Sequence, residues 1–222
     1  MTPVSHGKPC AGNPHARFEE GASASETPRR NALLHKPFIE SQCDEIAANF
    51  VALKALAPVV EQVACLWIDA LQAGGKVMFC GNGGSAADAQ HLAAELSGRY
   101  ELDRPGLAGL ALTTDTSALT AIGNDFGFER VFARQVEALG RPGDVLYAIS
   151  TSGNSPNVVA AVETARRLGI KTVAVTGAGG GRLKELCDLA LSVPATKANH
   201  IQELHIAVGH LLCGLVEKAL HG

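Results

Sequence analysis

The chain has 222 residues, of which 46% are hydrophobic, so it is long enough to bury one ordinary α/β domain and some additional segments. Nineteen basic residues against 22 acidic ones leave a net charge of −3, and the sequence contains no basic block. This balance argues against nucleic-acid binding through a broad phosphate footprint.

The cysteine usage and the N-terminus indicate a cytoplasmic protein. The six cysteines form no C-x-x-C pair; they are Cys10, Cys43, Cys65, Cys80, Cys187 and Cys213. Their apolar neighbours predict reduced core residues, with oxidative pairing as the weaker alternative. We find no apolar run that looks long enough to span a bilayer and no charged-then-apolar signal sequence, so we expect no membrane partner.

The first third of the chain divides into a leader and two helices. Residues 1–36 are rich in Pro, Gly, Ser, Thr and His without a hydrophobic period, which predicts a disordered leader before one domain at 37–222. Helices are expected at 38–56 and from Pro58 to the Gly74-Gly75 pair. Two helices are more than are needed to cover one face of a sheet. We therefore expect part of their apolar surface to be buried against another subunit.

Strand and helix patterns alternate through the rest of the chain. Apolar runs predict buried strands at 76–80, 107–112, 144–150, 171–176 and 189–193. Helical patterns occur at 85–99, 115–123, 128–139, 155–169, 181–187 and 198–220. The alternation predicts an α/β fold, a three-layer α-β-α sandwich with a five-stranded, mostly parallel sheet, preceded by the N-terminal helices.

A glycine-rich loop, Gly81-Asn82-Gly83-Gly84-Ser85, follows the first expected strand. Three glycines in five residues let the backbone approach a ligand and adopt positive φ, and Ser85 can cap the next helix. An ordinary glycine-rich turn is the alternative, and this loop alone does not decide between them. A second run, Gly177-Ala178-Gly179-Gly180-Gly181, is equally unspecific and is treated as a connection.

The most specific local signal is the segment Ser150-Thr151-Ser152-Gly153-Asn154-Ser155-Pro156. Pro156 suits a first helical turn and Ser155 its cap. A phosphate bound there would receive hydroxyls, backbone N–H groups and the positive end of a helix dipole. The loop lacks the lysine of an ATP-type phosphate loop, so a sugar phosphate is the expected ligand. A capped polar turn is the alternative, which four hydroxyls disfavour.

Two helices carry candidate metal ligands and acid/base groups. His91 and Glu95 stand at i and i+4, on one helix face, where they can chelate one divalent ion or form a plain hydrogen-bonded pair. The last helix carries polar groups among apolar residues, and each must be partnered or face a site. These groups are Gln202, Glu203, His205 and His210. The spacing does not say which histidine matters, although His205 is the expected bystander.

Three segments together resemble the sugar isomerase (SIS) domain family, and within it the phosphoheptose isomerases. They are CGNGGSAADAQHLAAELSGRY (80–100), AIGNDFGFERVFARQVEALGRPGDVLYAISTSGNSPNVV (121–159) and IQELHIAVGHLLCGLVEK (201–218). The resemblance covers residues 38–220 and excludes the leader. It implies a homotetramer with active sites near subunit interfaces and one Zn²⁺ per subunit.

The resemblance also assigns residues. It implies that substrate is bound by Asn82, Gly83, Gly84, Glu95, Asn124, Asp125, Ser150, Thr151, Ser152, Ser155 and Gln202. The implied zinc ligands are His91, Glu95, Gln202 and His210, and the implied acid/base pair is Glu95 and His210. Gln202 and His210 are about 12 Å apart along a helix and about 80° apart around it. Gln202 is therefore the least secure ligand; it could meet substrate instead, or the site could be shared between chains.

The implied reaction converts D-sedoheptulose 7-phosphate to D-glycero-D-manno-heptose 7-phosphate, the first step of ADP- or GDP-heptose biosynthesis. A proton moves between C1 and C2 through an enediolate, which requires a base, an acid and a group that holds the oxyanion. One alternative is a non-catalytic SIS regulator of the type that associates with the replication initiator; another is an isomerase of a different sugar phosphate, such as arabinose 5-phosphate. The presence of both Glu95 and His210 favours an enzyme.

Overall fold

The structure is a computed structural model in which residues 35–222 are described. It consists of two units, Met1–Asp44 and Glu45–Gly222, which we consider separately. In the first, residues 36–44 are helical and belong to α2 (Lys36–Leu53), and Phe38 is exposed. The predicted leader lies outside the described residues except for its last two, so it stays a prediction.

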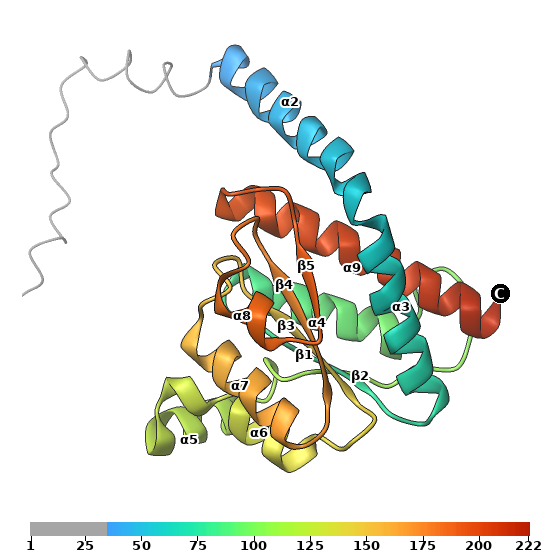
Figure 1. The fold of residues 1–222 in the computed structure, drawn as a ribbon, viewed down its shortest axis with the longest axis vertical. Coiled ribbons are helices and arrows are strands. Elements are labelled where there is room, and N and C mark those ends of the chain that lie inside the picture. Colours follow the sequence, from blue (N-terminus) through green and yellow to red (C-terminus); the bar gives the residue numbers. More distant parts are fainter. Residues whose placement is uncertain (1–34) are drawn as a thin grey trace, which may run out of the picture. The chain divides into compact units, whose positions relative to one another are not determined.

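Within the described residues, five strands form one sheet in the order β2-β1-β3-β4-β5, and every neighbouring pair is parallel (Figure 1). Their bounds are β1 Val77–Cys80, β2 Gly109–Ala111, β3 Val145–Ile149, β4 Lys171–Thr176 and β5 Leu189–Ser192. Every residue of β1 and β3 is buried, as their unbroken apolar runs predict. All five predicted strands are confirmed, in a sheet that is wholly parallel.

Helices cover both faces of this sheet, which confirms the predicted three layers. Odd-numbered β3 residues such as Tyr147 pack with α3, α4 and α9, and even-numbered ones such as Leu146 pack with α6, α7 and α8. The helices are α3 Ala57–Gln72, α4 Gly84–Ser97, α5 Thr116–Phe126, α6 Ala133–Leu139, α7 Pro156–Arg167, α8 Gly181–Leu186 and α9 Ala198–His221. The helix predicted at 128–139 is divided into a 3-10 turn, Phe128–Arg130, and α6.

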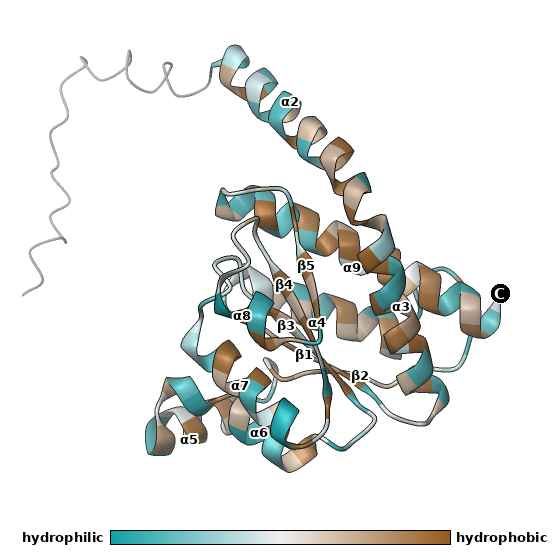
Figure 2. Cartoon of the chain, viewed as in Figure 1, coloured by the Kyte–Doolittle hydropathy of each residue, from teal (hydrophilic) through white to brown (hydrophobic). Residues whose placement is uncertain are grey.

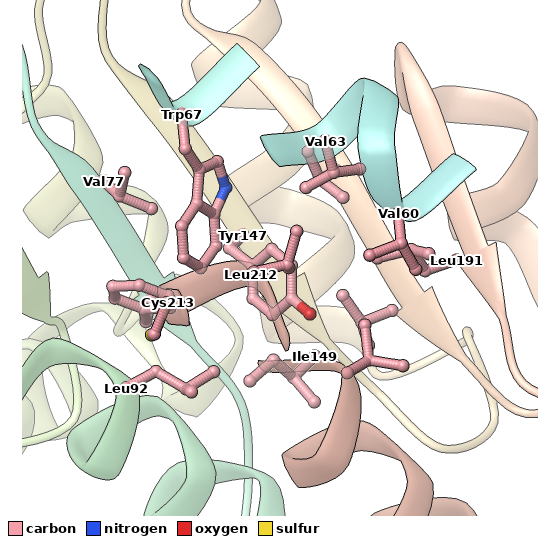
Figure 3. Close-up of a cluster of buried hydrophobic side chains, with 14 of the residues drawn as sticks. Val60, Val63, Trp67, Val77, Leu92, Tyr147, Ile149, Leu191, Leu212 and Cys213 are labelled. Atoms are coloured by element: carbon pink, nitrogen blue, oxygen red, sulfur yellow. The ribbon is translucent and has the colours of Figure 1, made fainter. Parts of the chain in front are cut away.

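The face covered by α3, α4 and α9 has an aromatic centre. The ring of Trp67 on α3 packs edge-on against Phe79 at 5.4 Å and Tyr147 at 5.1 Å between centroids. All three side chains are fully buried, and Figure 3 shows Trp67 beside Tyr147, Leu212 and Cys213. Edge-to-face packing of this kind adds to the free energy of burial, so it helps to hold α3 on this face of the sheet.

Two expectations from the sequence are wrong: that no apolar run is long enough to span a bilayer, and that the cysteines lie in the core. The stretch Lys36–Gln72 is long and apolar enough, by length and composition, to cross a membrane, although a buried core helix passes the same test. The second half of this stretch is α3, which packs on the sheet through its hydrophobic residues, coloured brown in Figure 2. Among the described cysteines, all of which are free, Cys43 and Cys65 are exposed rather than in the core. Cys65 lies on the solvent-facing side of α3, opposite buried Val63 and Trp67.

Candidate active site

The two glycine-containing loops lie next to each other because β1 and β3 are adjacent parallel strands. The chain proceeds from β1 to β2 on one side and from β3 to β4 on the other, so the strand order reverses between β1 and β3. Open α/β sheets bind ligands at this reversal, outside the carboxyl ends of the strands. The sequence-predicted loops 81–85 and 150–155 both begin there.

A reciprocal amide pair joins the first loop to the first turn of α7, directly after the second loop. Asn82 Nδ2 donates to Asn157 Oδ1 at 2.9 Å, and Asn157 Nδ2 donates to Asn82 Oδ1 at 2.8 Å. Asn157 is buried in the first turn of α7, where its Oδ1 also accepts the N–H of Val158. Asn82 thus supports the loop geometry, and Asn157 is a site residue that the sequence reasoning missed. The available signal in the sequence was an asparagine directly after Pro156, in the first turn of the predicted helix.

The two serines predicted as helix caps differ in outcome. Ser155 is the N-cap residue of α7 and Pro156 lies in its first turn, as predicted, but the Ser155 hydroxyl lies 2.9 Å from the Ser150 hydroxyl and does not cap. Ser85 lies inside α4, whose N-cap is Gly83, so the prediction that Ser85 caps this helix is wrong. The paired Ser150 and Ser155 hydroxyls do meet at the start of α7, as a phosphate cradle requires.

Three of the four predicted metal ligands converge. The Nε2 atom of His91 lies 2.9 Å from Nε2 of His210 and 3.2 Å from Oε1 of Glu95. The ligand atoms of this triad all lie within 4.8 Å of one another. Two imidazole nitrogens and one carboxylate oxygen that face a common point form a donor set typical of Zn²⁺, with positions left for water or substrate. The triad therefore fits a zinc ion.

The triad depends on close packing between α4 and α9, where glycines leave no room for side chains. A Cβ on Gly209 would lie 2.5 Å from Leu92 Cδ2, and one on Gly84 would lie 2.6 Å from Gln202 Nε2. These pairs show that α4 and α9 run in the same direction. Gln202 therefore lies beside Gly84 at the start of α4, and Gly84 is seven residues, about 10 Å along the helix, before His91. The role of Gln202 as a metal ligand stays a prediction.

Glu217, Arg104 and the backbone of residues 100–102 form a buried group, which we call the clamp, at the C-terminal ends of α4 and α9. Glu217 on α9 accepts the backbone N–H groups of Tyr100, Glu101 and Leu102 at 2.7–3.0 Å. It also pairs with Arg104 Nε at 2.9 Å, and both side chains are only 2% exposed.

Arg104 in turn connects the clamp to α4. Its guanidinium donates to the backbone carbonyls of Glu95 at 2.9 Å and Leu96 at 2.8 Å, at the end of α4. The clamp also places the Tyr100 ring 5.9 Å from the His210 ring. Sequence reasoning missed Arg104 and Glu217, which are 113 residues apart.

Three groups near the site have shifted pKa values. Burial raises the pKa of Glu217, but the three N–H groups and Arg104 outweigh it and lower the pKa to about 2. Asp88, one turn before His91, has its pKa raised to about 6 by burial, with His91 acting in the opposite direction. Burial lowers the pKa of His205 to about 4, so this histidine is neutral at pH 7.

The predicted sugar-binding pair lies apart from these groups in sequence and secondary structure. Asn124 and Asp125 occupy the exposed end of α5, and Asn124 Nδ2 donates to Asp125 Oδ1 at 2.8 Å. Within residues 35–222, neither side chain forms a hydrogen bond to the triad or to residues 150–155, which we call the serine loop. Their contact with substrate stays a prediction.

Comparison with known proteins shows the family. The family model of the SIS domain matches residues 43–177. A phosphoheptose isomerase of Akkermansia muciniphila is 60% identical over 185 residues, which is 83% of this chain and 98% of the relative. The chain belongs to the phosphoheptose isomerase family of SIS domain proteins.

Solved structures of the family share the fold. The phosphoheptose isomerase of Neisseria gonorrhoeae is 44% identical and superposes with a TM-score of 0.78 over 82% of this chain and 98% of its own. That of Francisella tularensis is 39% identical, with a TM-score of 0.80 over 82% and 97% of the two chains. The family, the fold and the isomerase class expected from the sequence are confirmed.

The low pKa of Glu217 predicts a specific acid sensitivity. The folded carboxyl titrates at about 2 against an ordinary 4.5, so its stabilisation is complete above 4.5 and is lost as the pH falls toward 2. Glu217→Gln should lower the free energy of unfolding at pH 7 by roughly 3–5 kcal/mol, because it leaves Arg104 buried and unpaired. It should also flatten the fall in melting temperature between pH 4.5 and pH 2, measured by circular dichroism.

The exposed Glu185 provides the control, since Glu185→Gln should melt like the wild type at every pH. An equally steep acid fall in Glu217→Gln and in the wild type would contradict the clamp.

Proposed function

We propose that the protein converts D-sedoheptulose 7-phosphate to D-glycero-D-manno-heptose 7-phosphate, the first step of ADP- or GDP-heptose biosynthesis. The observation that carries the proposal is the convergence of His91, Glu95 and His210, two of which lie on a helix that begins at the same strand reversal as the serine loop. The names of relatives with 60% identity support a heptose phosphate as substrate. Such a substrate has an anion to anchor at one end and a carbonyl to isomerise at the other.

The phosphate end is assigned to the serine loop. Ser150, Thr151, Ser152 and Ser155 would bind it together with the N-terminus of α7, whose dipole favours an anion. The sugar would extend toward α4, where Gly83 leaves the backbone open and the side chain of Gln202 lies against Gly84. Asn82, Asn124 and Asp125 complete the proposed substrate contacts. An anchored phosphate limits how the reactive carbons can move, which lowers the entropic cost of reaction.

Acid/base chemistry is assigned to two members of the triad. The Glu95 carboxylate would take the proton from C1 of the ketose and return it to C2 of the enediolate. The His210 imidazole would move the second proton between the two oxygens, O1 and O2, so that the aldose results without net gain or loss of atoms. Positioned groups of these kinds accelerate proton transfer by factors of about 10²–10⁴ each.

One zinc ion per subunit is the proposed cofactor. His91, Glu95, Gln202 and His210 would hold it. A carboxylate bound to zinc is a poorer base, so Glu95 would shift between the ion and the substrate, and His210 would transfer a proton only when its Nε2 is not bound to the ion. When bound, zinc would polarise the carbonyl of the substrate as a Lewis acid. The 3.2 Å contact between His91 and Glu95 supports the assignment, because it holds the carboxylate toward the two imidazoles.

A cytoplasmic homotetramer with sites near the subunit interfaces is the proposed assembly. An apolar groove supports it, and among its lining residues are Phe50, Leu53, Leu211 and Leu215. Phe50, Leu211 and Leu215 are 42–52% exposed, on α2 and α9. Monomeric proteins rarely expose apolar surface of this kind without a partner. Neighbouring copies would also supply site residues that a single chain leaves apart.

The proposal is tested by an aldose–ketose assay. The purified protein is given D-sedoheptulose 7-phosphate and, separately, D-arabinose 5-phosphate, and the products are followed by NMR. We expect conversion of the heptulose phosphate, loss of activity with a chelator, and recovery when Zn²⁺ is added. Binding of the sugar phosphate without conversion under any of these conditions would favour the regulatory alternative. Faster conversion of arabinose 5-phosphate would assign a different substrate.

The assignment of the base is tested by Glu95→Gln. This variant should bind the sugar phosphate but lose about 10²–10⁴-fold in kcat, because an amide cannot take a proton from carbon. Metal content is measured in parallel, so that loss of the ion is separated from loss of the base. Glu101→Gln, which removes an exposed carboxylate, should leave kcat unchanged. Full turnover by Glu95→Gln would refute the role of Glu95.

A further inference from the structure

The glycine run 177–181, which the sequence reasoning treated as a connection, packs directly against the serine loop. A Cβ on Gly181 would lie 2.4 Å from the Ser152 carbonyl oxygen, and one on Gly153 would lie 2.0 Å from the Gly180 carbonyl oxygen. Separations this short are forbidden, so neither glycine can be replaced unless the two backbones move apart. Gly153, Gly180 and Gly181 also have φ of +67°, +73° and +56°.

Hydrogen bonds fix the orientation of the serine loop against this segment. The N–H of Gly177 donates to the Thr151 carbonyl at 3.0 Å, and the N–H of Leu183 donates to the Gly153 carbonyl at 3.0 Å. The N–H of Arg182 donates to Asn154 Oδ1 at 2.9 Å. Three acceptors of the serine loop are thus held by residues 177–183, which we call the glycine buttress.

Holding the Thr151 carbonyl also sets the direction of a donor. The peptide bond is planar and trans, so the N–H of Ser152 points opposite to the Thr151 carbonyl. It therefore points away from the glycine buttress. A rotation of this one peptide would remove a backbone N–H donor from the proposed phosphate site.

We infer that the glycine buttress is a positioning element that determines how tightly the serine loop binds phosphate. Its residues need not touch the ligand; they act through the orientation of the Thr151–Ser152 peptide and of the loop hydroxyls. The inference rests on the proposed function, because it takes the serine loop as the phosphate site. It adds a second loop, more than 20 residues further along the chain, to the determinants of affinity.

The test compares Gly181→Ala with two matched controls. Gly74→Ala shares the strain of a positive φ (+80°), and Gly179→Ala alters the buttress itself; a Cβ at either position meets no atom within 4 Å. Calorimetry measures the Kd for inorganic phosphate, steady-state kinetics measure KM and kcat with the sugar phosphate, and melting curves report folding. Gly181→Ala should raise Kd and KM at least about 10-fold, the loss of one hydrogen bond to a charged group. Its kcat should stay near the wild-type value, and both controls should bind phosphate like the wild type.

Each other outcome counts against the inference. It is overturned if folded Gly181→Ala binds phosphate normally, if Gly74→Ala loses as much affinity, or if kcat falls while KM is unchanged. Should Gly181→Ala not fold, Gly177→Ala replaces it. Its Cβ would lie 2.5 Å from Cδ1 of Ile201, the end of a flexible side chain, and 3.0 Å from the Thr151 oxygen, so a smaller rise in Kd is expected.

Calorimetry also separates this inference from the proposed function. A wild type that binds phosphate but converts no sugar phosphate refutes the function alone, and the inference is then decided by the phosphate Kd of the variants. A wild type that binds no phosphate refutes both.

Discussion

The close contact of α4 and α9 is the constraint on which the active site depends. Gly209 lets α9 approach Leu92, and at that separation His210 reaches His91 across the helix pair. The Glu217–Arg104 pair then fixes the register by connecting the far end of α9 to the carbonyls that end α4. Helix packing tolerates little displacement before side chains lose contact. The triad is therefore a property of two packed helices rather than of any flexible segment.

The sheet supplies the second half of the site. Because β1 and β3 are neighbours at the strand reversal, the loop that leads into α4 and the loop that leads into α7 begin side by side. The Asn82–Asn157 pair connects them, so a displacement of the serine loop would be transmitted to the start of α4. Anchoring of the anion and positioning of the acid/base groups are in this way parts of one rigid arrangement.

The sequence predicted correctly those features that depend on local patterns of residues. Apolar runs identified all five strands, and the i, i+4 spacing placed His91 and Glu95 on one face. Prediction from the sequence failed where the outcome depends on how the chain folds. Nothing in the sequence pairs Glu217 with Arg104. The hydroxyl of Ser155 does not cap α7, because the Ser150 hydroxyl lies beside it after folding. The family resemblance supplied His210 as a partner of His91, which spacing alone left open.

A crystal structure of the zinc-loaded protein, with the ion located by anomalous scattering, tests the central claim most directly. The account predicts one ion per subunit at about 2.0–2.2 Å from Nε2 of His91, Nε2 of His210 and a carboxylate oxygen of Glu95. An ion bound elsewhere, or imidazoles of His91 and His210 that point apart in the loaded protein, would contradict the claim that α4–α9 packing builds the site.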